Sequence, residues 1–136
     1  MIVADCTLIV PMYVTEERTA LSEAVFLRDP IWLAPPLWRS EMRNAFRGYL
    51  RARKISLDDA KHGMRRAEAH MTGGEVVVSS DEVFDVVSTS GCTAYDAEYV
   101  AVAKGLGTRL VTADAELLRK FPGIAITAES FVNGAE

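Results

Sequence analysis

Histidine and cysteine, which supply most zinc sites and many hydrolase nucleophiles and bases, are scarce in this sequence. There are two of each in 136 residues, and neither Cys6 nor Cys92 belongs to a CxxC or Cys/His spacing. His62 and His70 lie on a predicted helix that is polar, and we expect both to be solvated. A disulfide framework, a structural zinc site and the Ser/His/Asp or Cys/His arrangements of other hydrolases are therefore excluded.

Long apolar runs and an excess of positive charge are also missing. No run approaches the roughly 20 residues that a membrane span needs, and no basic leader precedes the apolar residues 2–4. With so few cysteines, this favours a cytoplasmic protein with no membrane partner. The net charge of −4 argues against nucleic-acid binding through overall positive charge. Acids that hold a divalent cation would themselves make the balance negative, so a nucleic-acid substrate is not excluded.

What the sequence does contain is an alternation of short apolar segments with amphipathic ones, at a length and 49% hydrophobic content that suit one domain over residues 1–136. Helices are predicted to begin near Thr15, Leu37, Ser56, Ser80, Thr93 and Asp114. The predicted strands are 2–4, 31–34, 75–78, 109–112 and 124–126. This order predicts an α/β fold with parallel strands and right-handed crossovers. The carboxyl ends of the strands then share one edge of the sheet, where α/β proteins bind ligands.

Two aspartates follow predicted strands at that edge. Asp5 comes directly after the first strand, where an ionised side chain is costly unless it is paired, hydrogen-bonded or bound to a metal. Asp114 follows the strand 109–112. Each has a simpler explanation, because Asp is common in turns and at the first position of helices.

Glu41 lies on a predicted helix, 37–52, and at about 100° per residue it falls on the apolar half of that helix. A stripe of arginines occupies the other half, so no arginine of its own helix shares the face of Glu41. The stripe is Arg39, Arg43, Arg47 and Arg51. A partner from elsewhere in the fold or a role in a site explains an inward glutamate equally well.

Asp96 falls in the first turn of a helix that Thr93 can cap, and Gly105 and Gly107 can end it. The pair fits a capping pattern that needs no chemistry. Capping and cation binding are compatible.

Taken together, the four acids suggest more than each does alone, since acids after two strands and at the start of two helices can converge on one edge. Clustered carboxylates repel unless a cation lies between them, and oxygen ligands select Mg²⁺ or Mn²⁺. Such an ion suits phosphoryl chemistry because it activates a water molecule and neutralises charge on phosphate oxygens.

These residues resemble the PIN domains, and in particular the VapC-like toxin ribonucleases of type II toxin–antitoxin pairs. The likeness covers almost the whole chain, through the blocks 2–5 (IVAD), 36–41 (PLWRSE) with Asn44, 93–101 (TAYDAEYVA) and 110–114 (LVTAD). The resemblance implies a single PIN-like α/β domain with a five-stranded parallel sheet, flanked by helices on both faces. The strands that end near Asp5 and Asp114 would be neighbours.

The resemblance also implies a function and a set of residues. The expected activity is Mg²⁺- or Mn²⁺-dependent endonucleolytic cleavage of RNA by a homodimer, held inactive by a small antitoxin protein. Asp5, Asp96 and Asp114 would hold the metal, and Glu41 would complete the site or orient the attacking water. Residues expected to support the site are Thr7, Asn44, Thr112 and Glu116. The arginine stripe would contact RNA phosphates or antitoxin acids, although a solvated helix face explains it as well. The family usually has a small or hydroxyl residue after the first acid, where this chain has Cys6 followed by Thr7.

Two alternatives stay open. One is a PIN nuclease of RNA maturation or decay, and the other is a catalytically silent PIN-like binding module. The second is disfavoured because four unpaired, clustered carboxylates would destabilise a mere scaffold.

Overall fold

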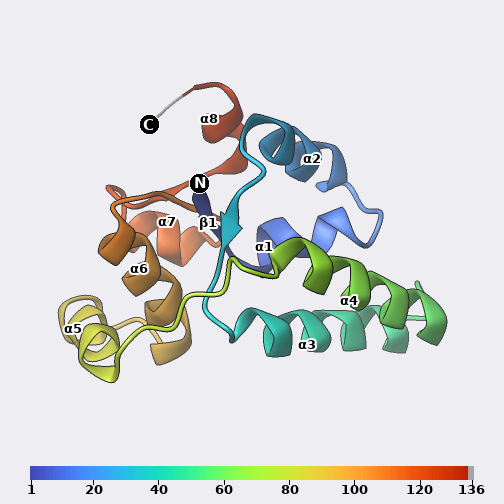
Figure 1. Ribbon diagram of the computed structural model, residues 1–136, viewed down its shortest axis with the longest axis horizontal. Coiled ribbons are helices and arrows are strands. Elements are labelled where there is room, and N and C mark those ends of the chain that lie inside the picture. Colours follow the sequence, from blue (N-terminus) through green and yellow to red (C-terminus); the bar gives the residue numbers. More distant parts are fainter. Residues whose placement is uncertain (135–136) are drawn as a thin grey trace.

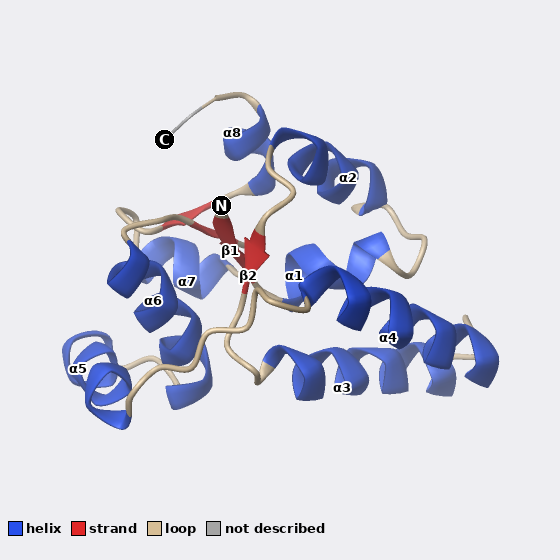
Figure 2. Cartoon of the chain, in the orientation of Figure 1, coloured by secondary structure: helices blue, strands red, loops and turns tan. Residues whose placement is uncertain are grey.

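A parallel sheet runs through the centre of the molecule, with its first strand, β1 (Ile2–Ala4), in an interior position (Figures 1 and 2). The computed structural model describes residues 1–134. Ala135 and Glu136, the last two residues of the predicted domain 1–136, lie outside the described residues. The other strands are β2 (Trp32–Leu33), β3 (Leu110–Val111) and β4 (Ala125–Ile126). Their order is β2-β1-β3-β4 and every pairing is parallel, so β1 and β3 are neighbours as predicted.

Helices flank the sheet. Every residue of the four strands is buried. Since successive side chains of a strand point to opposite faces, both faces are covered. The helices are α1 (Cys6–Ile9), the 3₁₀ helix η1 (Val10–Met12), α2 (Thr19–Arg28), α3 (Trp38–Arg51), α4 (Leu57–Met71), α5 (Ser80–Ser90), α6 (Ala94–Leu106), α7 (Ala115–Lys120) and α8 (Ala128–Val132). Figure 1 shows α3 and α4 side by side as a pair, with α5, α6 and α7 at the opposite end of the view. None of the helices within residues 1–134 is long and apolar enough to cross a bilayer.

The prediction of five strands is wrong by one, because segment 75–78 does not form a strand. It contributes a single parallel bridge, between Ala34 and Glu75, supported by hydrogen bonds from the Ala34 amide to the Gly74 carbonyl and from the Val76 amide to the Ala34 carbonyl. Val77 is 82% exposed, so the apolar run leaves the sheet after one bridge. Apolar composition favours a strand only where the fold can bury it.

Most predicted helix starts are confirmed, and one is wrong. Ser56 and Asp59 form the reciprocal capping box of α4, and Thr93 caps α6 by accepting from the Asp96 amide at 3.1 Å. Thr15 does not cap α2, which begins four residues later, after Arg18.

Candidate active site at the carboxyl edge of the sheet

Asp5 is held rigidly at the end of β1. It is 6% exposed, and its Oδ1 accepts from the Thr7 amide at 3.0 Å and from the Thr7 hydroxyl at 2.5 Å. The hydroxyl of Thr112, the residue that follows β3, donates to Oδ2. Burial raises the pKa of Asp5 above its usual range, the bonds from Thr112 and Thr7 oppose this, and the charge of Asp114 raises it further. Both threonines thus contact the first acid, as expected for residues that support a site.

Asp114 lies close to this group and also caps a helix. Its amide donates to Thr112 Oγ1 at 3.0 Å, and its Oδ1 accepts from the amides of Glu116 and Leu117 at 2.9 and 3.0 Å, at the start of α7. Within residues 1–134, its second oxygen, Oδ2, accepts no hydrogen bond. The simpler explanation of Asp114 as a cap is therefore correct, and it leaves one carboxylate oxygen for another ligand.

Glu41 points inward from the first turn of α3, as the helical pattern predicted. The Tyr99 hydroxyl, on α6, donates to Glu41 Oε1 at 2.5 Å and ties the two helices together. Burial raises the pKa of Glu41, the bond from Tyr99 lowers it, and the charges of Asp5 and Asp96 raise it again. An inward carboxylate whose nearest charges are other carboxylates has no structural ion pair to explain it.

Asp96 differs from the other acids that follow a helix cap. In α4 the Asp59 side chain closes the capping box by accepting from the Ser56 amide, but in α6 only the amide of Asp96 takes part in the cap made by Thr93. The carboxylate of Asp96 is thus left over. Burial raises its pKa, as do the charges of Asp114 and Glu116, while Lys120 lowers it.

The four predicted acids form one electrostatic group. Asp114 raises the pKa of Asp5, Asp5 and Asp96 raise that of Glu41, and Asp114 raises that of Asp96. Their oxygens are the hard ligands that Mg²⁺ and Mn²⁺ prefer, so the donor set fits such an ion. In the described part of the chain, no three carboxylate, histidine or cysteine side chains lie close enough together to form a complete cation site. Three of the acids accept hydrogen bonds from the protein: Asp5 from Thr7 and Thr112, Glu41 from Tyr99, and Asp114 from the start of α7.

The other residues that were predicted to support the site or to contact RNA differ in the contacts that they make. Glu116 pairs with Lys120 at 2.9 Å and acts on Asp96 through its charge. Asn44 is exposed on α3, and no hydrogen bond joins its side chain to residues 1–134. Arg39, the first arginine of the stripe, is committed to ion pairs with Glu68 and Glu75. The other three stripe arginines are exposed.

The sequence and the fold both match known proteins. A curated relative, Ribonuclease VapC3 of Pyrobaculum aerophilum, is 32% identical over 130 residues, which cover 90% of this chain and 96% of the relative. The chain belongs to the VapC ribonuclease family. The crystal structure of PAE2754 from Pyrobaculum aerophilum is similar as well, with a TM-score of 0.68 and 26% identity, covering 96% of this chain and 92% of that one. No family model matches the sequence. The resemblance to VapC-like proteins is thereby confirmed, over nearly the whole length of both chains.

In this VapC family chain, sequence reasoning missed three residues that shape the acidic group. Tyr99 is 1% exposed and holds Glu41, and Lys120 is a cation close enough to act on Asp96. The Cys6 thiol donates to the Trp38 carbonyl at 3.6 Å, and burial together with the charges of Glu41 and Asp5 raises its pKa, so it stays protonated. Tyr99 had a signal, since it lies three positions after Asp96 on the same helix face. The expectation that His70 is solvated is wrong, because it packs against Phe26 and Trp32, with ring centroids 4.9 and 5.0 Å away.

Removing the Tyr99 hydroxyl should weaken the site without disturbing the core. Tyr99→Phe keeps the buried ring but takes away the donor to Glu41, so the pKa of Glu41 should rise further. RNA cleavage should fall about tenfold, and the acidic limb of its pH profile should move to higher pH.

Tyr95→Phe is the matched control, since Tyr95 lies on the same helix and is 64% exposed. It should leave both the rate and the pH profile unchanged. Equal behaviour of the two variants would show that Tyr99 does not position Glu41.

Proposed function

We propose that this chain is a Mg²⁺- or Mn²⁺-dependent endoribonuclease that acts as the toxin of a toxin–antitoxin pair. The observation that carries the proposal is that Asp5 and Asp114 follow the neighbouring strands β1 and β3 and are joined through Thr112, which donates to Asp5 and accepts from the Asp114 amide. The charges of Asp5 and Asp96 raise the pKa of Glu41, and that of Asp114 raises the pKa of Asp96, so the carboxylates lie near one another. Such a group is costly for a scaffold and useful for holding a divalent cation. The similarity to Ribonuclease VapC3 supports RNA as the substrate.

The four acids would have two roles, metal binding and orientation of the attacking water. Asp5, Asp96 and Asp114 would hold the cation, and Glu41, oriented by Tyr99, would complete the site or orient the attacking water. Thr7 and Thr112 keep the Asp5 carboxylate in one orientation through their hydroxyl groups. When bound, the divalent cation would supply a Lewis acid for the phosphate oxygens and for the attacking water.

Two further proposals follow from the family. The chain would act as a homodimer in the cytoplasm, and its partner would be a small antitoxin that covers the site. A short open reading frame directly upstream that encodes a DNA-binding protein would support the toxin role over a role in RNA maturation or decay.

The direct test is an RNA cleavage assay. We expect the purified chain to cut cellular RNA when Mg²⁺ or Mn²⁺ is present and to stop when EDTA removes the ion, with cut ends mapped by sequencing. Cleavage that continues at the same rate in EDTA would contradict a metal-dependent mechanism. A chain that cuts no RNA under either condition would favour the silent binding module.

A further inference from the structure

The pair of helices α3 and α4 carries most of the positive charge of this chain. Residues 38–71, which comprise the two helices and the turn between them, hold nine of the 15 Lys and Arg residues but four of the 19 Asp and Glu residues. The segment therefore has a net charge of +5, while the remainder of the chain has one of −9. Figure 1 shows the pair at one end of the molecule. A surface whose sign is opposite to that of the rest of the protein points to a partner of negative charge.

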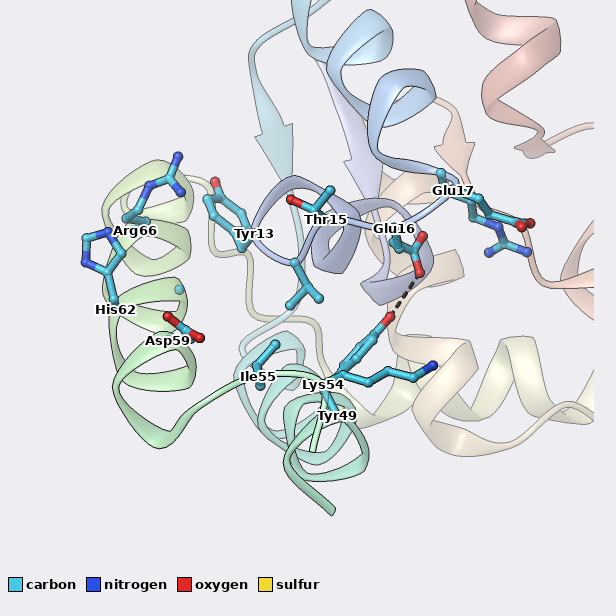
Figure 3. A pocket seen from close by; sticks show the side chains of 13 residues that line it. Tyr13, Thr15, Glu16, Glu17, Tyr49, Lys54, Ile55, Asp59, His62 and Arg66 are labelled. Atoms are coloured by element: carbon cyan, nitrogen blue, oxygen red, sulfur yellow. Dashed lines mark hydrogen bonds between the residues drawn. The ribbon is translucent and has the colours of Figure 1, made fainter. Parts of the chain in front are cut away.

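Two hollows border this pair of helices, and they differ in charge. The larger, of about 790 Å³, lies between α4, the end of α3 and the segment that joins η1 to α2 (Figure 3). It is lined by three carboxylates as well as by three Lys or Arg side chains, so its charges balance. The other, of about 340 Å³, lies between residues 43–50 of α3 and 60–68 of α4, and we call it the outer groove. At about 100° per residue, the two hollows lie on opposite faces of α4.

The charged side chains of the outer groove are mostly cations without a counter-ion. Arg43, Lys61 and Arg65 are exposed and, within residues 1–134, form no ion pair. One carboxylate also lines the groove, that of Glu68, and it is paired with Arg39. The outer groove thus has the excess of positive charge that the larger hollow lacks.

Apolar side chains lie between these cations. Phe46 is buried in the groove, and Leu50 and Met64 are half-buried. Leu57, which is 58% exposed, precedes Met64 by seven residues and so lies on the same face of α4. An apolar strip bordered by charges is the kind of surface on which an amphipathic helix docks, and a methionine side chain adapts to the shape of its partner.

The apolar strip favours a protein over a nucleic acid as the occupant. Proteins that bind single-stranded nucleic acid stack its bases on accessible aromatic rings. Phe46, the aromatic residue of the groove, is 2% exposed and offers no such ring. A phosphate backbone gains nothing from contact with Leu57 and Met64, whereas the apolar face of a helix removes both from water.

We propose that the outer groove binds an acidic amphipathic helix of a partner protein. The apolar side chains of that helix contact Leu57 and Met64, and its carboxylates contact Lys61 and Arg65. The inference goes beyond the proposed function, because none of the four acids of the candidate active site lines the groove. Glu41 in particular lies about 160° around α3 from Arg43, on the other side of that helix.

The test uses two labelled synthetic peptides of identical composition. One is a helical peptide with leucine along one face and glutamate on the other, and the second has the same residues in an order that gives no apolar face. Binding of each peptide to the full chain is measured by fluorescence anisotropy in EDTA. We expect the amphipathic peptide to bind at least about tenfold more tightly than the scrambled one, and its affinity to fall as salt screens the charges. Amide NMR signals that shift on binding should be those of residues 43–50 and 57–68.

Two variants test the charge and the apolar strip separately. Arg65→Gln and Leu57→Gln change exposed side chains, and glutamine is a good helix former, so both proteins should fold as the parent does. Arg65→Gln should weaken peptide binding about threefold, as expected for an exposed ion pair, and reduce its salt dependence. Leu57→Gln should weaken binding about tenfold and leave the salt dependence unchanged. Arg51→Gln is the matched control, since Arg51 is an exposed arginine of α3 that lines neither hollow, and it should keep the parent affinity.

The proposal is overturned if the two peptides bind alike, if Arg65→Gln and Leu57→Gln keep the parent affinity, or if Arg51→Gln weakens binding as much as Arg65→Gln does. Displacement of the peptide by a short single-stranded RNA would assign the groove to RNA instead. Self-association of the parent chain that Leu57→Gln abolishes would assign it to a second copy. RNA cleavage with Mn²⁺ is measured separately, so a chain that binds the acidic helix but cuts no RNA contradicts the proposed function and not the groove.

Discussion

Asp5→Asn should reduce RNA cleavage at least about a hundredfold, the order lost when a group that stabilises transition-state charge is removed, and it should do so without destabilising the fold. Asparagine has almost the same shape as aspartate, keeps one carbonyl oxygen for the two donors of Thr7, and can donate from its amide group to the Thr112 hydroxyl oxygen. It removes the negative charge that a divalent cation needs. The measurement is the initial rate of RNA cleavage in Mn²⁺, with urea unfolding on the same samples.

The effect on stability has a definite sign. Burial and Asp114 raise the pKa of Asp5 in the folded state above its unfolded value. The folded state therefore binds the proton more tightly, so stability is lost as pH rises from the unfolded pKa through the folded pKa. At neutral pH the ionised Asp5 is a cost, and Asp5→Asn should unfold at the same or a higher urea concentration than the parent.

Asp85→Asn is the control, since Asp85 is exposed on α5 and its charge is not among those that shift the pKa of Asp5, Glu41 or Asp96. It should keep the parent rate and stability. An Asp5→Asn protein that cleaves RNA at the parent rate would remove Asp5 from the site, and one that loses activity only because it unfolds would leave the assignment without support.

The second large effect is expected from the metal itself. Mn²⁺ should raise the thermal midpoint, because an ion that binds the folded state relieves the repulsion among the carboxylates. A ligand at about 100 times its dissociation constant contributes about 2.7 kcal/mol, which for a chain of this size is a rise of roughly 10 °C. The rise should shrink as pH falls through the raised pKa values of Asp5, Glu41 and Asp96, since protonated carboxyl groups do not hold the ion.

Two variants distinguish Mn²⁺ binding by the four acids from non-specific Mn²⁺ binding elsewhere on the protein. Asp96→Asn should lose most of the Mn²⁺-induced rise, because it removes a carboxylate that the cap at Thr93 does not use. Asp85→Asn should show the full rise. A parent chain whose midpoint does not move with Mn²⁺, or an Asp96→Asn chain that responds like the parent, would contradict a cation site at this edge.

The spacing and order of residues in the sequence predicted part of the structure around the acids. Helical spacing placed Glu41 on the inward side of α3. The position of Asp5 directly after a buried strand indicated that its charge needs a partner, a hydrogen bond or a metal, and its simpler explanation as a cap is correct, because its side chain caps α1. The same reasoning failed for segment 75–78, because its valines favour a strand equally well whether or not a neighbouring strand is there to pair with them. It also failed for His70, whose polar helix gives no sign of the aromatic rings that pack against it from other elements.

The sequence by itself determined the alternation of strands and helices, the parallel sheet and the positions of Asp5 and Asp114 after two of its strands, because these depend on periodicity and on the order of residues along the chain. The tertiary structure decided how each carboxylate is used. The bond from Tyr99 to Glu41 joins residues 58 positions apart, and that from Thr112 to Asp5 spans 107. It also showed that the positive charge of Arg39 is already paired, with Glu68 and Glu75. Such contacts join elements that meet only when the chain folds, so no local pattern carries them.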